Sequence, residues 1–188
     1  MHQRKVNPES LVCRLLEVLS ELMGEEEKPN QVDTAIGVLA CLRELMSRDA
    51  ALGKILHDNE LVKCLLRSLH KTKLIGISAQ RVAASTVRLL HMYLKSYPAA
   101  EKPFAAMLGY RMLLGTLQRL GDPHQDTMES LLEWVTERIP RDESDSRLRN
   151  ITLAVQLVRW LPTLESPEKQ LFLANEVAVL AEKGSRAR

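Results

Sequence analysis

Five histidines are the side chains that could bind a metal or act as acid and base: His2, His57, His70, His91 and His124. A metal site on a helix needs two ligands on one face, as a His-x-x-x-His or Glu-x-x-His pair provides. The sequence contains neither pattern. We therefore expect these side chains to be solvated or to lie at helix ends, and we expect no metal site and no cofactor.

The sequence also offers few candidates for a nucleophile. Cys13, Cys41 and Cys64 are odd in number, far apart and without a neighbouring base. We predict that they are inert thiols on apolar helix faces in a reducing compartment, with disulfides or metal ligation as the alternative. Gly-x-Ser-x-Gly is absent, and Gly76 and Gly121 are isolated glycines that form no phosphate-binding loop. These observations predict a protein that is not an enzyme and has no small-molecule substrate.

Basic side chains gather toward the end of one predicted helix: Lys63, Arg67, His70, Lys71 and Lys73. Cations near a helix C-terminus interact favourably with the macrodipole, by about 0.3–1 kcal/mol each, which explains the cluster without a ligand. The alternative is a surface for acidic partner segments or for anionic lipid headgroups.

An acidic segment, Asp142–Ser146, is polar and has no helical periodicity. We expect a solvated loop there. Phosphorylation of its serines is the alternative.

Composition limits both the fold and the class of partner. The 188 residues include 26 basic and 24 acidic side chains, and a net charge near +2 gives no electrostatic case for nucleic acid. Apolar residues make up 45% of the chain but aromatic residues only 4%, so aliphatic side chains must fill the core, as is typical of packed helices. No apolar run approaches the ~18 residues of a membrane span, and no signal peptide is recognisable. We therefore expect an all-α protein located in the cytoplasm.

Apolar residues recur at helical spacing along most of the chain. Asn7 and Pro8 suit the N-cap and first position of a helix that Gly24 ends. The other long predicted helices cover about residues 31–47, 78–97, 126–139, 148–161 and 167–182, and shorter ones lie between them. Asp49, Asn59 and Ser78 are the predicted N-caps of three helices in the first half of the chain.

Two tryptophans, Trp134 and Trp160, fall within apolar stripes. We predict that they lie in the core or between repeats, because large aromatic residues at helical spacing usually do. A groove-lining anchor for a peptide is the alternative.

A comparison of the chain with itself indicates repeats. Shifted by 49 residues, Ser47–Ala51 falls on Ser96–Ala100, and Ile55 falls on Phe104. Each copy is predicted to hold a long, a short and a medium helix, the anatomy of an armadillo-type repeat with its period of about 40–47 residues. We predict one domain, residues 1–188, with core repeats at about 31–73 and 78–121 and flanking partial repeats at 8–24 and 123–183. Stacking of these two- and three-helix repeats predicts an armadillo/HEAT-type α-solenoid, a right-handed superhelix.

The third helix of each repeat generally forms the concave face of such a protein. Here that helix corresponds to Glu60–Lys71 and Arg111–Gln118. The candidate partner-binding surface consists of the exposed side chains of Lys63, Arg67, Lys71, Arg111 and Gln118.

Several segments carry a resemblance to a known family. A Gly-Tyr pair, Gly109-Tyr110, opens a leucine-rich helix, and Trp160-Leu161-Pro162-Thr163-Leu164 ends another. The other matching segments are Val87-Arg88-Leu89-Leu90, Phe104–Leu108, Leu131-Leu132-Glu133-Trp134-Val135, Ala154–Arg159 and Gln170-Leu171-Phe172-Leu173. The stretch from Val82 to Leu173, about half of the chain, resembles the armadillo-like region of large BEACH-domain proteins, particularly the neurobeachin-like branch. Residues 1–72 match only as a generic repeat.

The resemblance implies a role in a large cytoplasmic scaffold of vesicle trafficking, granule biogenesis and autophagy, peripheral to endomembranes. The lectin-like, pleckstrin-like, BEACH and WD-repeat domains of that family do not fit within this chain, so we expect a fragment, a short isoform or an excised piece. The expected function is a non-enzymatic scaffold that binds a protein partner. The alternatives are an unrelated armadillo/HEAT adaptor subunit of a cytoplasmic complex, and a membrane-surface helical module that uses Lys63, Arg67, Lys71 and Lys73 to contact anionic membranes.

Overall fold

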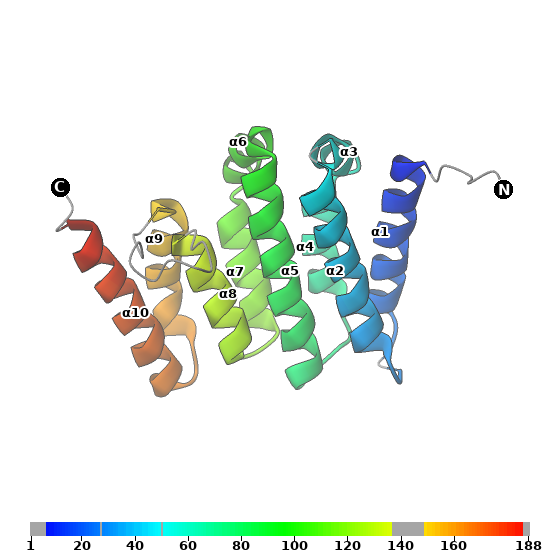
Figure 1. Cartoon of the computed structure of the whole chain (residues 1–188). Helices are drawn as coiled ribbons and strands as arrows, with labels where there is room; N and C mark the ends of the chain where they lie inside the picture. Colours follow the sequence, from blue (N-terminus) through cyan, green and yellow to red (C-terminus); the bar gives the residue numbers. More distant parts are fainter. Residues whose placement is uncertain (1–6, 27, 50, 137–148, 186–188) are drawn as a thin grey trace.

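The computed structural model describes residues 7–26, 28–49, 51–136 and 149–185, and all regular structure in these ranges is helical (Figure 1). The prediction of an all-α fold is therefore confirmed. The α-helices are α1 (Pro8–Gly24), α2 (Gln31–Arg48), α3 (Leu52–Asp58), α4 (Leu61–Lys71), α5 (Gly76–Ser96), α6 (Glu101–Ala106), α7 (Gly109–Arg119), α8 (Gln125–Thr136), α9 (Ile151–Trp160) and α10 (Pro167–Ser185). Two 3₁₀ turns, η1 (Pro98–Ala100) and η3 (Leu161–Thr163), precede α6 and follow α9.

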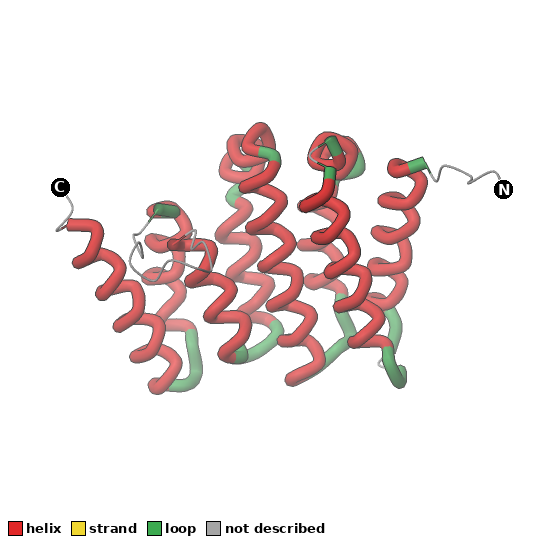
Figure 2. Tube along the Cα trace, in the orientation of Figure 1, coloured by secondary structure: helices red, strands yellow, loops and turns green. Residues whose placement is uncertain are grey.

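The long helices pack in two rows. In one row α2 packs against α5, α5 against α8, and α8 against α10. In the other row α1 packs against α4, α4 against α7, and α7 against α9. Figure 1 shows the rows running side by side from the N-terminal to the C-terminal end, with α3 and α6 seen end-on at one edge, and Figure 2 shows the short loops that join the helices. The buried apolar side chains form one continuous cluster that extends from α1 to α10.

Helix ends and buried positions recur at an offset of 48 residues, not at the 49 that the sequence comparison predicts. Helix α4 begins at Leu61 and α7 at Gly109, 48 residues later. At this offset every buried residue of α2 falls on a buried residue of α5, and every buried residue of α4 on one of α7. At an offset of 49, buried Met46 would fall on exposed Lys95. One residue of shift turns a helix by about 100°, which moves a core position to the surface.

The same 48-residue offset extends to α8. Seven buried residues of α5 fall on seven buried residues of α8, with Thr86 on Trp134 and Val87 on Val135. Helix α9 departs from this spacing, because its buried residues follow those of α7 by 44 positions, with Leu157 in the place of Leu113. The third set of helices is therefore related to the first two but not identical in length.

Local sequence explains where the helices begin, with some corrections. Asn7 caps α1 as predicted, since its side chain accepts a hydrogen bond from the N–H of Glu9. Asn59 and Ser78 are not caps: α4 follows Glu60, which has a left-handed backbone (φ 54°), and α5 begins at Gly76, two residues before Ser78. The sequence hides the start of α4, because a left-handed residue other than glycine has no clear signature.

Two further predicted boundaries differ. Asp49 accepts a hydrogen bond from the N–H of Ala51, but α3 begins only at Leu52, with Ala51 at the N-cap. The predicted extension of α8 to residue 139 and the acidic segment 142–146 lie outside the described residues.

Candidate functional site

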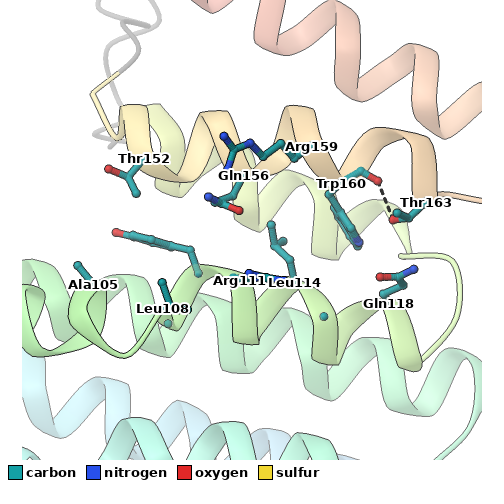
Figure 3. Close-up of a pocket in the computed structure, with 13 residues that line it drawn as sticks. Ala105, Leu108, Arg111, Leu114, Gln118, Thr152, Gln156, Arg159, Trp160 and Thr163 are labelled. Atoms are coloured by element: carbon teal, nitrogen blue, oxygen red, sulfur yellow. Dashed lines mark hydrogen bonds between the residues drawn. The ribbon is translucent and has the colours of Figure 1, made fainter.

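A groove of about 700 Å³ lies between α7 and α9 and is referred to below as the α7–α9 groove (Figure 3). It lies on the row formed by α1, α4, α7 and α9. Its lining residues are Ala105, Leu108, Gly109, Tyr110, Arg111, Leu114, Gly115, Gln118, Thr152, Gln156, Arg159, Trp160 and Thr163. Figure 3 shows side chains from the two helices facing each other across the groove.

Polar contacts at both ends of the groove fix its two walls. At one end Asn150 caps α9 by accepting a hydrogen bond from the N–H of Leu153 (2.9 Å), and its amide donates to the Tyr110 hydroxyl on α7 (2.9 Å). At the other end the Asp122 carboxylate accepts hydrogen bonds from the N–H groups of Glu165 (2.7 Å) and Ser166 (2.9 Å). These contacts tie the start of α9 to α7 and the α7–α8 turn to the turn after α9.

The pKa of Asp122 is consistent with this role. Burial alone would raise it, but the two backbone hydrogen bonds and nearby Lys169 outweigh burial, and the net shift is downward. Asp122 is therefore held as the carboxylate that accepts both N–H donors.

The groove is basic. Arg111 on α7 and Arg159 on α9 are both exposed, and no aspartate or glutamate lines the groove. Among the described residues, no carboxylate lies within 4 Å of either guanidinium as an ion-pair partner. Gln118 and Gln156 add amide groups to the two walls, and Leu108, which is 59% exposed, supplies apolar surface.

One donor at the groove has no partner. Trp160 is only 4% exposed, and its Nε1 makes no hydrogen bond with any described residue. A buried donor without a partner costs about 1–3 kcal/mol. Figure 3 shows the indole nitrogen directed from α9 toward the space between α9 and α7. The core location predicted for Trp160 is confirmed, and its edge also lines the groove.

The structure brings together only part of the predicted surface. Arg111 and Gln118 line the groove. Lys63, Arg67 and Lys71 are exposed on neighbouring α4 but do not line it. Sequence reasoning missed Gln156 and Arg159, although Arg159 directly precedes the tryptophan that was singled out.

The basic cluster on α4 is partly neutralised. Lys63 pairs with Glu60, and this hydrogen bond and charge hold the pKa of Glu60 below its usual value. The guanidinium of Arg119 donates to the backbone carbonyl of His70. Lys71 and Lys73 are exposed beside Ile75 and Ile77, which are 78% and 64% exposed.

One histidine, His91, differs from the prediction of solvated or helix-end side chains, whereas His57 is exposed in the last turn of α3, as predicted. His91 lies in the middle of α5, half-buried and stacked on Trp134 with 5.8 Å between ring centroids. Burial lowers its pKa from 6.5 to about 4, with a smaller contribution from Lys95. His57 Nδ1 lies 3.1 Å from the hydroxyl of buried Tyr93.

The cysteines are all free thiols, and one of them was placed wrongly. Cys41 is exposed, not on an apolar face, because it lies on the outer side of α2. Cys13 and Cys64 are half-buried; the Cys13 thiol donates to the side chain of Asn59, and burial raises the pKa of Cys64. Within the described ranges, no three histidine, cysteine, aspartate or glutamate side chains form a group that could hold a metal ion.

Comparisons with known proteins add no family to this geometry. No protein-family model matches the chain, and no solved structure matches it. Among the described residues, every helix is too short or too polar to cross a bilayer.

Proposed function

We propose that the chain is an armadillo-type α-solenoid with a right-handed superhelical course, and that it acts as a non-enzymatic scaffold for a protein partner. The 48-residue recurrence of buried positions over α2, α5 and α8 supports the repeat assignment. The two rows of neighbouring helices support it as well. Stacked repeats bury their apolar faces against each other and leave an extended surface for a partner.

The α7–α9 groove is the observation that carries the binding function. It combines apolar surface at exposed Leu108 with a few polar groups, the guanidiniums of Arg111 and Arg159 and the free N–H of Trp160. Binding sites commonly have this composition, because apolar surface supplies affinity and a few polar groups set orientation. Among the described residues, no histidine, cysteine, aspartate or glutamate lines the groove to act as a base or to activate a hydroxyl, so its chemistry favours binding over turnover.

The test uses a Gly115→Trp variant. A Cβ atom at Gly115 would meet nothing within 4 Å, so a large side chain there fills the groove without displacing the core. The matched control is Gly37→Trp on α2, in the other row, where the added Cβ is equally free. Peptides are selected on the wild-type chain from a random displayed library, and their affinities are then measured by fluorescence polarisation.

Gly115→Trp should weaken the selected peptides by at least about tenfold, a loss of 1.4 kcal/mol or more, while Gly37→Trp leaves them unchanged. Peptides that bind both variants alike, or a library that yields no binder, would contradict the proposal. A robust hydrolase or transferase activity lost on a point substitution would contradict the non-enzymatic assignment.

We also propose that the parent protein belongs to the BEACH family, in the cytoplasm and peripheral to endomembranes. Two of the segments that carry the resemblance help to form the groove, since Gly109-Tyr110 opens α7 and Trp160-Leu161-Pro162 ends α9. Reading the coding sequence beyond Arg188 tests this. A BEACH or lectin-like domain supports the proposal, whereas a frame without either favours an unrelated armadillo/HEAT adaptor.

A membrane-surface module is the second candidate, because Ile75 and Ile77 are exposed beside Lys71 and Lys73. Insertion of isoleucines together with basic side chains is a common mode of attachment to anionic lipid. Co-sedimentation with phosphatidylserine vesicles should fall for an Ile75→Asp/Ile77→Asp variant if this candidate is correct. Sedimentation that is absent, or equal in both proteins, rules it out.

A further inference from the structure

We propose that the α7–α9 groove binds an extended acidic segment of a polypeptide, with carboxylates at Arg111 and Arg159 and a main-chain carbonyl at Trp160 Nε1. This inference rests on the proposed function of the groove and names the chemistry of its occupant.

The charge of the groove favours an anionic occupant. Arg111 on α7 and Arg159 on α9 line opposite walls, and the described lining contains no carboxylate. Arg81 pairs with Asp33 at 2.9 Å and Arg48 with Glu44 at 2.7 Å, whereas neither arginine of the groove has such a partner among the described residues. Arginine forms two parallel hydrogen bonds with a carboxylate, which makes it well suited to acidic side chains.

The position of Trp160 favours a ligand that enters the groove. Its Nε1 is buried and lacks an acceptor, so the free protein bears the cost of an unmade hydrogen bond. A ligand that supplies a carbonyl oxygen removes this cost on binding. An extended peptide presents carbonyl groups at regular intervals, whereas the flat surface of a membrane does not reach a recessed nitrogen.

The dimensions of the walls set the length of the segment. Helix α9 has ten residues, or about 15 Å at 1.5 Å per residue. An extended chain advances about 3.3–3.6 Å per residue, so four to five residues span the wall. Side chains of an extended strand point alternately to opposite sides, so acidic residues at alternate positions can share one face.

Gly115 leaves room for this segment. At the equivalent position 48 residues earlier α4 carries Arg67, and at the position 44 residues later α9 carries Arg159. The arginine side chain is missing only on α7, where its Cβ would face open space. The absence of a side chain at Gly115 therefore leaves open space in the groove, next to the cationic side chains of Arg111 and Arg159.

The test uses fluorescein-labelled hexapeptides of alternating glutamate and leucine, with matched peptides in which glutamine or lysine replaces glutamate. They are titrated against the full chain by fluorescence polarisation at two salt concentrations. The glutamate peptide should bind at least about tenfold more tightly than the glutamine peptide, and the difference should shrink at high salt. The lysine peptide should not bind.

Three substitutions assign the contacts. Arg111→Gln and Arg159→Gln should each weaken the glutamate peptide by about tenfold or more and leave the glutamine peptide nearly unchanged. Trp160→Phe, which keeps an aromatic ring but removes the N–H, should weaken both peptides by the same factor. Arg43→Gln, at an exposed arginine on α2 in the other row, is the matched control and should change neither.

Equal affinity of the glutamate and glutamine peptides would overturn the inference, as would an effect of Arg43→Gln equal to that of Arg159→Gln. Anionic vesicles that bind through Arg111 and Arg159 would also overturn it and assign the groove to lipid. The outcomes separate the two proposals: selected peptides that bind in the groove without acidic residues leave the scaffold function intact and reject only the acidic occupant. Circular dichroism of every variant confirms that the fold is kept.

Discussion

Two hollows near α7 differ in how their polar groups are satisfied. Between α4 and α6, a hollow of about 240 Å³ is lined by polar groups that have partners, with His57 beside the Tyr93 hydroxyl and Lys63 paired with Glu60. Between α7 and α9, the larger groove has two arginines that form no ion pair with a described residue and an indole N–H that has no acceptor among the described residues. In the smaller hollow the polar groups bond to each other. In the α7–α9 groove they are free to bond to a ligand.

Packing reinforces the difference. Phe104, 1% exposed, lies against Tyr110 edge to face with 4.8 Å between ring centroids, and it also lies near Trp134. This aromatic cluster closes the seam, which we define as the contact of α7 with α4 and α6. Across the groove no such cluster exists among the described residues, and Gly115 leaves the floor open.

The largest expected effect on stability comes from removing Phe104, the buried ring of the aromatic cluster. Phe104→Ala should lower the free energy of unfolding by about 3–5 kcal/mol, because it removes a fully buried ring and leaves a cavity. Gln156→Ala, on the groove side, should change it by less than about 0.5 kcal/mol. Chemical denaturation of both variants measures the values, and equal losses would show that the two sides do not differ.

Substitution of the two glycines of α7 by alanine should change the free energy of unfolding in opposite directions. A Cβ atom at Gly109 would overlap the ring of Phe104, so Gly109→Ala should cost about 1–3 kcal/mol through forced repacking. Gly115→Ala meets open space and should stabilise the helix by up to about 1 kcal/mol. Thermal unfolding of both variants checks the prediction, and a loss of stability at Gly115 would mean that the floor of the groove is packed.

A second buried nitrogen without a hydrogen-bond partner among the described residues, on His91, allows a test of how stability depends on pH. His91 Nε2, like Trp160 Nε1, makes no hydrogen bond with a described residue, but unlike the indole it can take up a proton. Its pKa is about 4 in the fold and 6.5 when unfolded, so the unfolded chain binds more protons between these values. The stability contributed by neutral His91 is therefore present above pH 6.5 and is lost as the pH falls toward 4.

His91→Phe should remove this part of the pH dependence, and Trp160→Phe should not. The measurement is the denaturation midpoint of each variant and of the wild-type chain from pH 7 to pH 4. An unchanged slope in His91→Phe would mean that other groups cause the dependence.

The smallest expected effect is at the edge of the seam. Arg119 donates to the backbone of His70, but both side chains are exposed. Arg119→Ala should therefore change stability by less than about 1 kcal/mol, since exposed charge-assisted contacts are weak. A loss above 2 kcal/mol in urea denaturation would show that this contact contributes more to the seam than its exposure suggests.

Much of the helical pattern was predictable from the sequence because apolar spacing and caps are local. Asn7 and Pro8 marked the start of α1, and Pro167 marked that of α10. The length of the repeat was predicted one residue too long. Ser47–Ala51 and Ser96–Ala100 match at an offset of 49 residues, whereas the buried positions recur at an offset of 48. Loop residues can match by composition, whereas burial obeys the phase of the helix.

The α7–α9 groove could not be predicted from local sequence patterns. Arg111 and Gln118 could be placed on an exposed face from the pattern of α7, but the opposite wall belongs to α9, some 40 residues later. Its distance from α7 depends on tertiary contacts such as Asn150 with Tyr110 and Asp122 with the turn before α10. The open donor of Trp160 depends on the same contacts, so only the structure could identify it.

The place of α9 in its row has a consequence for exchange kinetics. In the described structure α9 packs against α7, α8 and α10 at the C-terminal end of the molecule, while α7 lies between α4 and α9. We expect openings of α9 away from α7 to expose the amide hydrogens of α9 to solvent. A ligand that bridges both walls must suppress those openings in proportion to its occupancy. Occupation of the groove should thus be recorded as slowed deuterium uptake in α9, with little change in α2.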